Sequence, residues 1–258
     1  MSSPKIGLAL GTISNKLKTP ADYRACLKQV GQIGYEGVEW TAIDPAIDVK
    51  EYGRILEGEG LICCANHAGE ADLRERLGTV VENSRTLGCT TLAFPCLDQK
   101  YWSEEGVQSV AAFLNETGEA LRQEGIQLLY HNHHFEFNRI GRKTILELIY
   151  ERTDPQNLWA ELDTYWIQHG GGDPVGWIQR MKGRTNHLHC KDKGMQGADS
   201  VFMEIGEGNL DWTRIVAAAK EADIEWYLVE QDSSRRDTLE SAAISFDALQ
   251  SALYPEGA

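Results

Sequence analysis

The sequence lacks the features that mark membrane proteins, disulfide-stapled secreted proteins and nucleic-acid-binding proteins. No apolar run reaches the length of a membrane span. None of the six cysteines forms a C-x-x-C pair, and their spacing indicates neither a zinc ribbon nor a disulfide framework. Lys and Arg number 25 against 39 Asp and Glu, which gives a formal net charge of −14. Because nonspecific nucleic-acid affinity comes largely from basic side chains, we expect no nucleic-acid partner and no attraction to an anionic membrane.

The cysteine surroundings and the first residues favour a cytoplasmic location. Most cysteines lie in apolar stretches such as LICCAN and LAFPC, and we interpret them as small core residues. The opening segment MSSPKIGLALGT contains an apolar run shorter than a signal peptide requires. We therefore expect a cytoplasmic protein without a membrane partner.

Short apolar segments alternate with longer segments of helical periodicity, and no linker or low-complexity stretch divides the chain. Eight such segments are predicted as strands: KIGLAL, GVEW, LICCAN, TTLAFP, IQLLYHNH, LWAELD, NHLHCK and WYLVEQ. This alternation favours parallel strands joined by crossover helices. We predict an α/β fold, a (β/α)8 TIM barrel forming a single domain over residues 1–258. The alternative is an open doubly wound sheet, but no G-x-G-x-x-G motif follows the first strand.

Residues at the segment boundaries support predicted helix ends. Thr19 is followed by a proline and, three positions on, by Asp22, which is the pattern of a capped helix start. Asp173 before Pro174 repeats the cap and the proline. Glycines at the ends of periodic segments, at Gly34, Gly60, Gly88 and Gly125, are typical of helix C-termini.

The last four predicted strands all end on titratable residues. These ends read YHNHHFEF, AELDTYW, NHLHCKD and YLVEQD, whereas the preceding halves are apolar. Because residues two apart share one face of a strand, several titratable side chains fall on common faces. The sets are His131 with His133, Glu161 with Asp163, His187 with His189 and Lys191, and Glu230 with Asp232. Glu136 has the opposite parity and points inward only if the strand bends or ends near His133.

A metal site is predicted here, because each of these four strand ends offers one candidate ligand. Glu136, Asp163, His189 and Glu230 would bring three carboxylates and one imidazole to one point at the barrel rim. Buried carboxylates this close repel one another unless a cation lies among them. Oxygen ligands with one nitrogen suit Mn²⁺ best, with Mg²⁺, Co²⁺ and Zn²⁺ as alternatives. Taken one at a time, each residue has an ordinary structural role available, such as a turn cap or half of an ion pair.

These motifs, in this order, resemble those of the sugar phosphate isomerase/epimerase proteins in the xylose-isomerase-like TIM barrel superfamily. The resemblance is carried by YHNHHFEF, ELDTYW with GGGDPVGWI, HLHCKD, IGEGNLDW and YLVEQD, and covers nearly the whole chain. It implies one divalent metal held by Glu136, Asp163, His189 and Glu230. Many relatives have Asp where His134 stands. Relatives are often dimers or tetramers, so a homo-oligomer is compatible with the resemblance.

The resemblance also implies proton transfer next to a carbonyl of a sugar or keto-sugar, through an enediolate. Under this reading Glu136 and Glu230 are the acid/base pair, and Lys191 and His133 assist the catalysis. Residues expected to contact the substrate are His67, His131, Trp40, Trp166 and Glu207, the last in a loop beyond the seventh strand. The substrate itself, and whether it is phosphorylated, are left open.

Three other functions compete with an isomerase or epimerase. A lyase uses the same enolate for inosose dehydration or for elimination from a 3-keto-glycoside, with an added general acid such as His131, His133 or Lys191. Apurinic-site endonucleases share the superfamily, but their D-T-x-H pattern reads Asp163-Thr164-Tyr165-Trp166 here. An inactive sugar-binding protein is disfavoured because all four ligand positions are filled.

Overall fold

Eight parallel strands close into a barrel in the computed structural model, which describes residues 3–41 and 47–255. Around the barrel the order of the strands is β1-β12-β9-β8-β5-β4-β3-β2. Their bounds are β1 Lys5–Ala9, β2 Gly37–Trp40, β3 Ile62–His67, β4 Thr91–Phe94, β5 Gln127–His131, β8 Leu158–Asp163, β9 Thr185–Cys190 and β12 Trp226–Val229. Each strand falls within or close to one of the eight predicted segments, so the prediction of a TIM barrel is confirmed.

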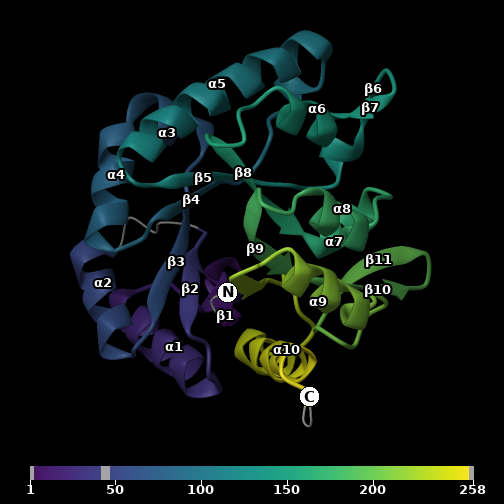
Figure 1. The fold of residues 1–258 in the computed structure, drawn as a ribbon. Coiled ribbons are helices and arrows are strands. Elements are labelled where there is room, and N and C mark those ends of the chain that lie inside the picture. Colours follow the sequence, from purple (N-terminus) through teal and green to yellow (C-terminus); the bar gives the residue numbers. More distant parts are fainter. Residues whose placement is uncertain (1–2, 42–46, 256–258) are drawn as a thin grey trace.

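Helices surround the barrel and connect successive strands (Figure 1). They are α1 Pro20–Ile33, α2 Val49–Gly58, α3 Glu70–Glu75, α4 Leu77–Thr86, α5 Glu104–Gln123, α6 Ile145–Glu151, α7 Thr164–His169, α8 Pro174–Arg180, α9 Trp212–Glu221 and α10 Thr238–Leu253. Short 3-10 helices are η1 Leu10–Lys16, η2 Gln99–Tyr101 and η3 Phe135–Phe137. Two hairpins project beside the barrel: β6 Arg139–Ile140 with β7 Lys143–Thr144, and β10 Asp192–Gln196 with β11 Asp199–Met203.

The predicted helix ends follow the expected chemistry. The Thr19 side chain accepts a hydrogen bond from the backbone of Asp22, whose carboxylate accepts one from the backbone of Thr19, so a capping box starts α1. Asp173 caps α8 through the backbone N–H groups of Val175 and Gly176. The four glycines expected at helix ends all have positive φ, between 63° and 120°, which explains the choice of glycine there.

The N-terminal end of the barrel interior is closed by apolar side chains. Trp226 and Leu228 of β12 point inward and form a small buried cluster with Cys64. A Cβ atom on Gly37 would lie 2.8 Å from the Trp226 ring, and one on Gly7 would lie 2.6 Å from a Leu228 methyl. Glycine at these two strand positions therefore leaves room for the Trp226 and Leu228 side chains. The polar part of the barrel interior lies beyond them, toward the C-terminal ends of the strands.

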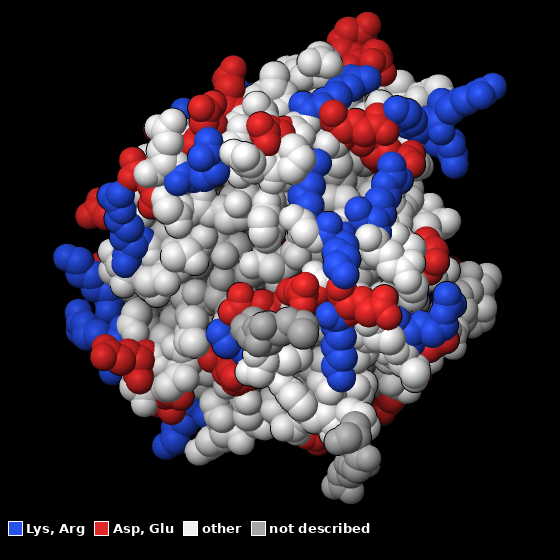
Figure 2. All heavy atoms as spheres, in the orientation of Figure 1, with Lys and Arg blue, Asp and Glu red and all other residues white. Residues whose placement is uncertain are grey.

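A continuous hydrophobic core lies between the barrel and its helices and includes side chains such as Leu27 of α1, Leu114 of α5 and Leu249 of α10. In the part of the chain that the structure describes, no helix is both long and apolar enough to cross a membrane. Figure 2 shows acidic and basic side chains interspersed over one face, with acidic ones also crossing its middle.

Candidate active site

Four side chains converge at the C-terminal ends of neighbouring strands. His131 ends β5, Asp163 ends β8, His189 lies near the end of β9, and Glu230 directly follows β12. One ligand atom from each lies within 4.8 Å of the others. This is the rim group. Asp163 and His189 are register partners, because β8 and β9 pair in parallel.

Glu136 does not join the other three predicted ligands. The strand ends at His131 and the chain turns into the 3-10 helix η3, which carries the Glu136 carboxylate back toward the strand it follows. That carboxylate accepts hydrogen bonds from the Tyr130 hydroxyl at 2.7 Å and from the backbone N–H of His133 at 2.9 Å. His131 takes the fourth place in the rim group instead. The rim group therefore contains two imidazoles and two carboxylates, where the sequence predicted a set of three carboxylates and one imidazole.

Lys191 supplies a buried positive charge beside the rim group. Its Nζ lies 2.6 Å from Glu230, 3.2 Å from Asp163 and 2.8 Å from Asp232, and its side chain is fully buried. These carboxylates raise the pKa of Lys191 despite burial, which by itself lowers it. Lys191 therefore carries its charge at neutral pH. Asp192, the next residue in the chain, turns away from Lys191 and accepts hydrogen bonds from the 206–212 segment.

A second set of possible metal ligands lies deeper in the barrel and was not predicted. It consists of Glu39 of β2, His67 of β3, Glu161 of β8 and His189, with ligand atoms within 4.8 Å of one another. This is the inner group. Both carboxylates are fully buried. The signal for Glu39 is a lone carboxylate in the apolar segment GVEW, since an isolated buried charge is costly. Glu161 shares a strand face with Asp163 and was not included among the ligands.

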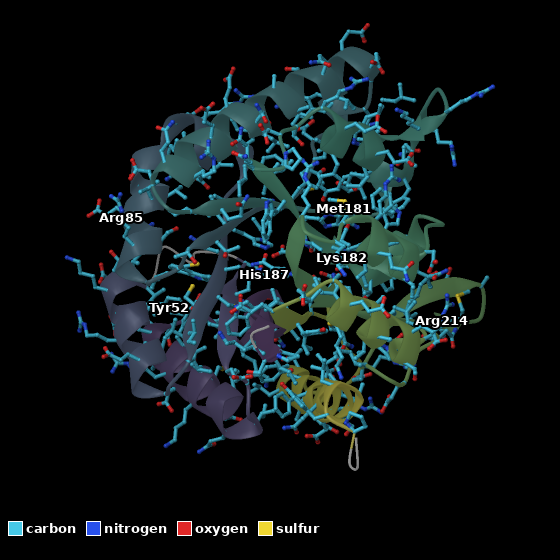
Figure 3. All side chains as sticks on the ribbon, in the orientation of Figure 1. Tyr52, Arg85, Met181, Lys182, His187 and Arg214 are labelled. Carbon is cyan, nitrogen blue, oxygen red and sulfur yellow. The ribbon has the colours of Figure 1, made fainter. Side chains whose placement is uncertain are left out.

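His189 belongs to both groups through different ring nitrogens. Its Nδ1 lies 2.9 Å from Glu230, while its Nε2 lies 2.7 Å from Glu39 and 3.4 Å from Glu161. His187, two residues earlier, points into the barrel but bonds elsewhere, to Asn186 and to the backbone oxygen of Cys64. Figure 3 shows His187 near the middle of the barrel. Of the two, only His189 links the rim and the interior.

The donor atoms of both groups fit a cation. Several buried atoms of the two groups have no hydrogen-bond partner: Asp163 Oδ2 and His131 Nδ1 in the rim group, and His67 Nε2, His189 Nε2 and both oxygens of Glu39 and of Glu161 in the inner group. Asp163 Oδ2 lies 3.2 Å from Lys191 Nζ, and His131 Nδ1 lies 3.3 Å from Glu161 Oε2. Buried polar atoms are almost always satisfied by hydrogen bonds, by ions or by water. Two imidazoles and two carboxylates form a donor set that zinc and other divalent transition metals accept.

Burial and neighbouring charges shift the pKa of several rim residues. Burial and the nearby His189 lower the pKa of His131 to about 3. Burial and the Lys191 charge lower the pKa of His133 to about 4, so both imidazoles are neutral at pH 7. Burial raises the pKa of Asp163 to about 6, although Lys191 opposes the shift. Burial opposes ionisation of Glu230, but Lys191 and His189 outweigh it and lower its pKa well below the usual range.

In the inner group, the pKa of His67 is raised, whereas the pKa values of His131 and His133 at the rim are lowered. Burial lowers the pKa of His67, but Glu39 and Glu161 outweigh it and raise the pKa to about 10. Burial raises the pKa of Glu39, but His189 and His67 outweigh it and hold the pKa well below the ordinary value. The attraction between these groups is strong because the surroundings are apolar.

Of the remaining predicted site residues, His133 and Trp166 lie near the rim group and Glu207 lies away from it. The His133 ring lies beside Trp166 of α7, with ring centroids 5.3 Å apart, and the Trp166 ring centroid is 5.2 Å from Lys191 Nζ. Glu207 pairs with Arg236 at 2.8 Å, outside both groups.

Trp40 does not lie where substrate contact was expected. Its ring is fully buried against Tyr52 of α2, with ring centroids 4.5 Å apart. Neighbouring residues of β2 point to opposite sides, so Glu39 faces the barrel interior and Trp40 faces the helices. Trp40 is a core residue.

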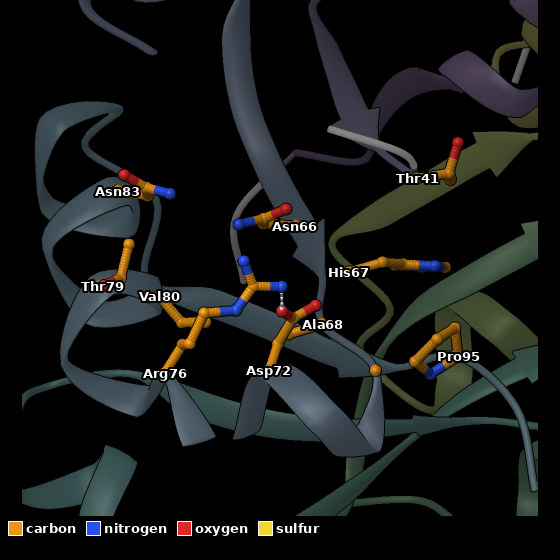
Figure 4. A pocket seen from close by; sticks show the side chains of 11 residues that line it. Thr41, Asn66, His67, Ala68, Asp72, Arg76, Thr79, Val80, Asn83 and Pro95 are labelled. Atoms are coloured by element: carbon orange, nitrogen blue, oxygen red, sulfur yellow. Dashed lines mark hydrogen bonds and ion pairs between the residues drawn. The ribbon is translucent and has the colours of Figure 1, made fainter. Parts of the chain in front are cut away.

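A polar pocket of about 440 Å³ opens beside the inner group. His67 forms part of its wall, together with Thr41, Asn66, Asp72 and Arg76, and Figure 4 shows these side chains around the opening. Thr41 Oγ1 and Asn66 Oδ1 are buried without a hydrogen-bond partner. Arg76 pairs with Asp72 across the pocket wall. The pocket thus presents several hydrogen-bonding groups close to a possible metal ligand.

The chain is similar in sequence to an inosose dehydratase and in structure to a sugar phosphate isomerase/epimerase. It is 28% identical to an inosose dehydratase of Mesomycoplasma hyopneumoniae over 173 residues. This alignment covers 60% of this chain and 57% of that protein. The chain therefore spans little more than half the length of this curated relative. A sugar phosphate isomerase/epimerase from Parabacteroides distasonis superposes with a TM-score of 0.82 and 25% identity, over 99% of this chain and 96% of that one.

The fold is also shared with the IOLI protein, whose crystal structure contains a zinc atom. That superposition has a TM-score of 0.74 and 16% identity, over 96% of this chain and 98% of the other. The family model of the xylose isomerase-like TIM barrel matches residues 27–252. This match covers most of the chain, including all four residues of the rim group and all four of the inner group. The protein therefore belongs to the xylose isomerase-like TIM barrel family.

Proposed function

We propose that this protein is a divalent-metal-dependent isomerase or epimerase of a sugar or keto-sugar that transfers a proton on the carbon next to a carbonyl. The observation that carries the proposal is the convergence of His131, Asp163, His189 and Glu230 beside the Lys191 ammonium at the barrel rim. In TIM barrels the carboxyl ends of the strands form the active site. The isomerase/epimerase with a TM-score of 0.82 supports the same reaction class.

The rim group would hold the cation. Bound there, a divalent metal would act as a Lewis acid that polarises the substrate carbonyl and eases loss of the neighbouring proton. Two imidazoles and two carboxylates favour Zn²⁺ or Co²⁺ more than the expected set with three carboxylates did, although Mn²⁺ and Mg²⁺ remain candidates.

Glu230 and His133 are the proposed acid/base pair. Glu230 is ionised at neutral pH because Lys191 and His189 stabilise its charge. The His133 ring is neutral, and its Nδ1 has no hydrogen-bond partner. A carboxylate that follows β12 and a neutral imidazole that follows β5 would remove a proton from one side of a substrate carbon and return one from another direction. Lys191 would stabilise the negative oxygen that develops, since its charge is held in a dry site.

Glu136 is proposed as a positioning residue. It accepts the backbone N–H of His133 and so fixes the turn that presents the His133 ring. This replaces the acid/base role expected from the sequence, because its carboxylate faces Tyr130 and the backbone.

The polar pocket is proposed to bind the hydroxyl groups of the substrate. Thr41 and Asn66 offer unpartnered buried oxygens, and His67 connects the pocket to the inner group. The Arg76 guanidinium is already paired with Asp72, which favours a neutral polyhydroxylated substrate over a phosphorylated one. A cytoplasmic location and a homo-oligomer remain predictions.

A dehydratase is the second candidate, and the match to an inosose dehydratase favours it. After the same proton is removed, a hydroxyl would leave from the next carbon as water, and a general acid would protonate it. Lys191 or His133 would supply that proton. The first step is common to both reactions.

The test is incubation with candidate keto-sugars, inosose among them, in D₂O with Co²⁺ or Mn²⁺. An isomerase or epimerase incorporates deuterium at the α-carbon and yields an isomer of equal mass apart from the label. A dehydratase yields a product lighter by one water. Glu230→Gln should abolish both outcomes. The matched control is Glu225→Gln, a surface carboxylate paired with Lys5 at the other end of the barrel.

Two results would contradict the proposal. An isomer of equal mass formed without deuterium incorporation indicates a hydride shift, which needs neither Glu230 nor His133 as a base. Undiminished turnover in Glu230→Gln, or in enzyme freed of metal by a chelator, removes the rim group from the reaction.

A further inference from the structure

We propose that the inner group, formed by Glu39, His67, Glu161 and His189, is a second divalent-cation site inside the barrel, separate from the rim site. It shares only His189 with the rim group and uses the other ring nitrogen, Nε2. With both sites filled, His189 would lose its ring N–H proton and bridge the two cations as an imidazolate. The inference rests on these residues and their contacts and does not depend on which reaction the rim catalyses.

The two groups differ in how their carboxylates are neutralised. At the rim, Lys191 lies within 3.2 Å of both Asp163 and Glu230. In the inner group, every ion-pair contact that the structure gives for Glu39 and Glu161 is to a histidine, and no lysine or arginine of the described residues reaches them. Two buried carboxylates need positive charge beside them, which here comes either from protonated imidazoles or from a bound cation, and one divalent cation supplies two charges.

The hydrogen bonding of the inner group is incomplete in a way that a cation completes. Both oxygens of Glu39, both of Glu161, His67 Nε2 and His189 Nε2 lack hydrogen-bond partners, and both glutamates are fully buried. The atoms approach to 2.7–3.4 Å without hydrogen-bond geometry. Closely packed donors aimed at a common point, two nitrogen and two oxygen, are the arrangement of a four-coordinate metal.

The strands explain why these donors meet. β2 and β8 lie opposite one another, with three strands between them on either side. Glu39 and Glu161 therefore reach the barrel axis from opposite walls. His67 opens onto the polar pocket, which gives a cation a path from solvent.

The experiment counts cations in the full-length chain. Protein stripped with a chelator is loaded with Co²⁺ and desalted, and cobalt per chain is measured by elemental analysis and by its visible absorption. Wild type should hold two, and Glu39→Gln and Glu230→Gln one each, with different spectra because different donors remain. His187→Gln is the control, an inward-facing histidine of the same strand outside both groups, and it should keep both.

Stability supplies a readout independent of loading. In chelator, Glu39→Gln should melt lower than wild type, because His67 and His189 lose the carboxylate that contacts both of them. With Co²⁺, its rise in melting temperature should be smaller than that of wild type, since one site is gone.

The outcomes separate the two proposals. One cobalt per wild-type chain, kept in Glu39→Gln and lost in Glu230→Gln, overturns the inner site and leaves the rim site standing. One cobalt kept in Glu230→Gln and lost in Glu39→Gln supports the inner site and contradicts metal at the rim. A Glu39→Gln variant that gains as much stability from Co²⁺ as wild type shows that these residues form only a histidine–carboxylate ion-pair network, and also overturns the inference.

Discussion

The hydroxyl of Tyr130 donates a 2.7 Å hydrogen bond to the buried Glu136 carboxylate, a residue on the turn that follows the same strand. This bond and that from the backbone of His133 favour the charged form, but burial outweighs them and raises the pKa of Glu136 to about 7. An acid that is hard to ionise in the folded state makes stability depend on pH.

We expect Glu136 to make the fold lose stability as pH rises. An unfolded glutamate ionises near pH 4.3, whereas the folded one keeps its proton up to about pH 7. Its stabilising contribution is full below about pH 4, declines as the pH rises through 7, and then levels off. Glu136→Gln, which mimics the protonated acid, should gain on the order of 3 kcal/mol relative to wild type across this window.

The measurement for Glu136 is urea unfolding of both proteins in chelator between pH 4 and pH 9. Tyr130→Phe is the companion variant: it removes a bond to the charged form, so the decline should extend to higher pH. Parallel curves for wild type and Glu136→Gln would show that Glu136 ionises normally in the fold.

Replacing Lys191 by methionine should damage both stability and activity. Asp163, Glu230 and Asp232 would lose the cation that contacts all three. Leaving buried charges unpaired costs about 3–5 kcal/mol. We also expect turnover to fall at least about 100-fold, the size of one lost electrostatic stabiliser.

Added divalent metal should restore more stability to Lys191→Met than to wild type, because a cation among the same carboxylates replaces the missing charge. Melting temperatures with and without Co²⁺ test this. Lys193→Met, a change two residues along the chain, serves as control. An equal metal response in wild type and Lys191→Met would rule out a shared electrostatic role.

Asp192→Asn should loosen the segment that follows β11. The Asp192 carboxylate accepts hydrogen bonds from the backbone N–H groups of Gly206, Gly208 and Leu210 and from the Trp212 indole. An amide in its place turns an NH₂ group toward these donors, and we expect a loss of about 2–4 kcal/mol. Hydrogen exchange should accelerate at residues 206–212 and stay unchanged in the barrel strands. Uniform acceleration would show that Asp192 holds the whole fold rather than this segment.

Gly118→Ala should destabilise the contact between α5 and the start of β8. A Cβ atom there would lie 2.0 Å from the backbone oxygen of Asn157, which has little freedom to move. Overpacking of this kind costs about 1–3 kcal/mol. Gly58→Ala at the end of α2 meets nothing within 4 Å and should be neutral or stabilising by up to about 1 kcal/mol. Thermal melts of both variants compare the two, and equal stability would mean that α5 shifts without cost.

Much of the fold was predictable because its signals are local. Short apolar segments, the Thr19–Asp22 capping box and glycines with positive φ are properties of short stretches, and the structure contains each of them. The convergence of Asp163, His189 and Glu230 was predictable for a similar reason. Each lies at the end of one of three consecutive parallel strands, so strand order alone brings them together.

The sequence by itself determined the barrel and the convergence of three candidate ligands at the ends of successive strands, because alternation along a strand and pairing between neighbours are short-range rules. Only the tertiary structure decided the rest. The direction of the Glu136 side chain depends on whether the strand continues beyond His131 or turns there. The sequence has no periodic pattern at this turn from which its geometry could be predicted. Closure of the barrel brings Glu39 and Glu161 face to face from opposite strands, a contact that depends on all eight strands being in place.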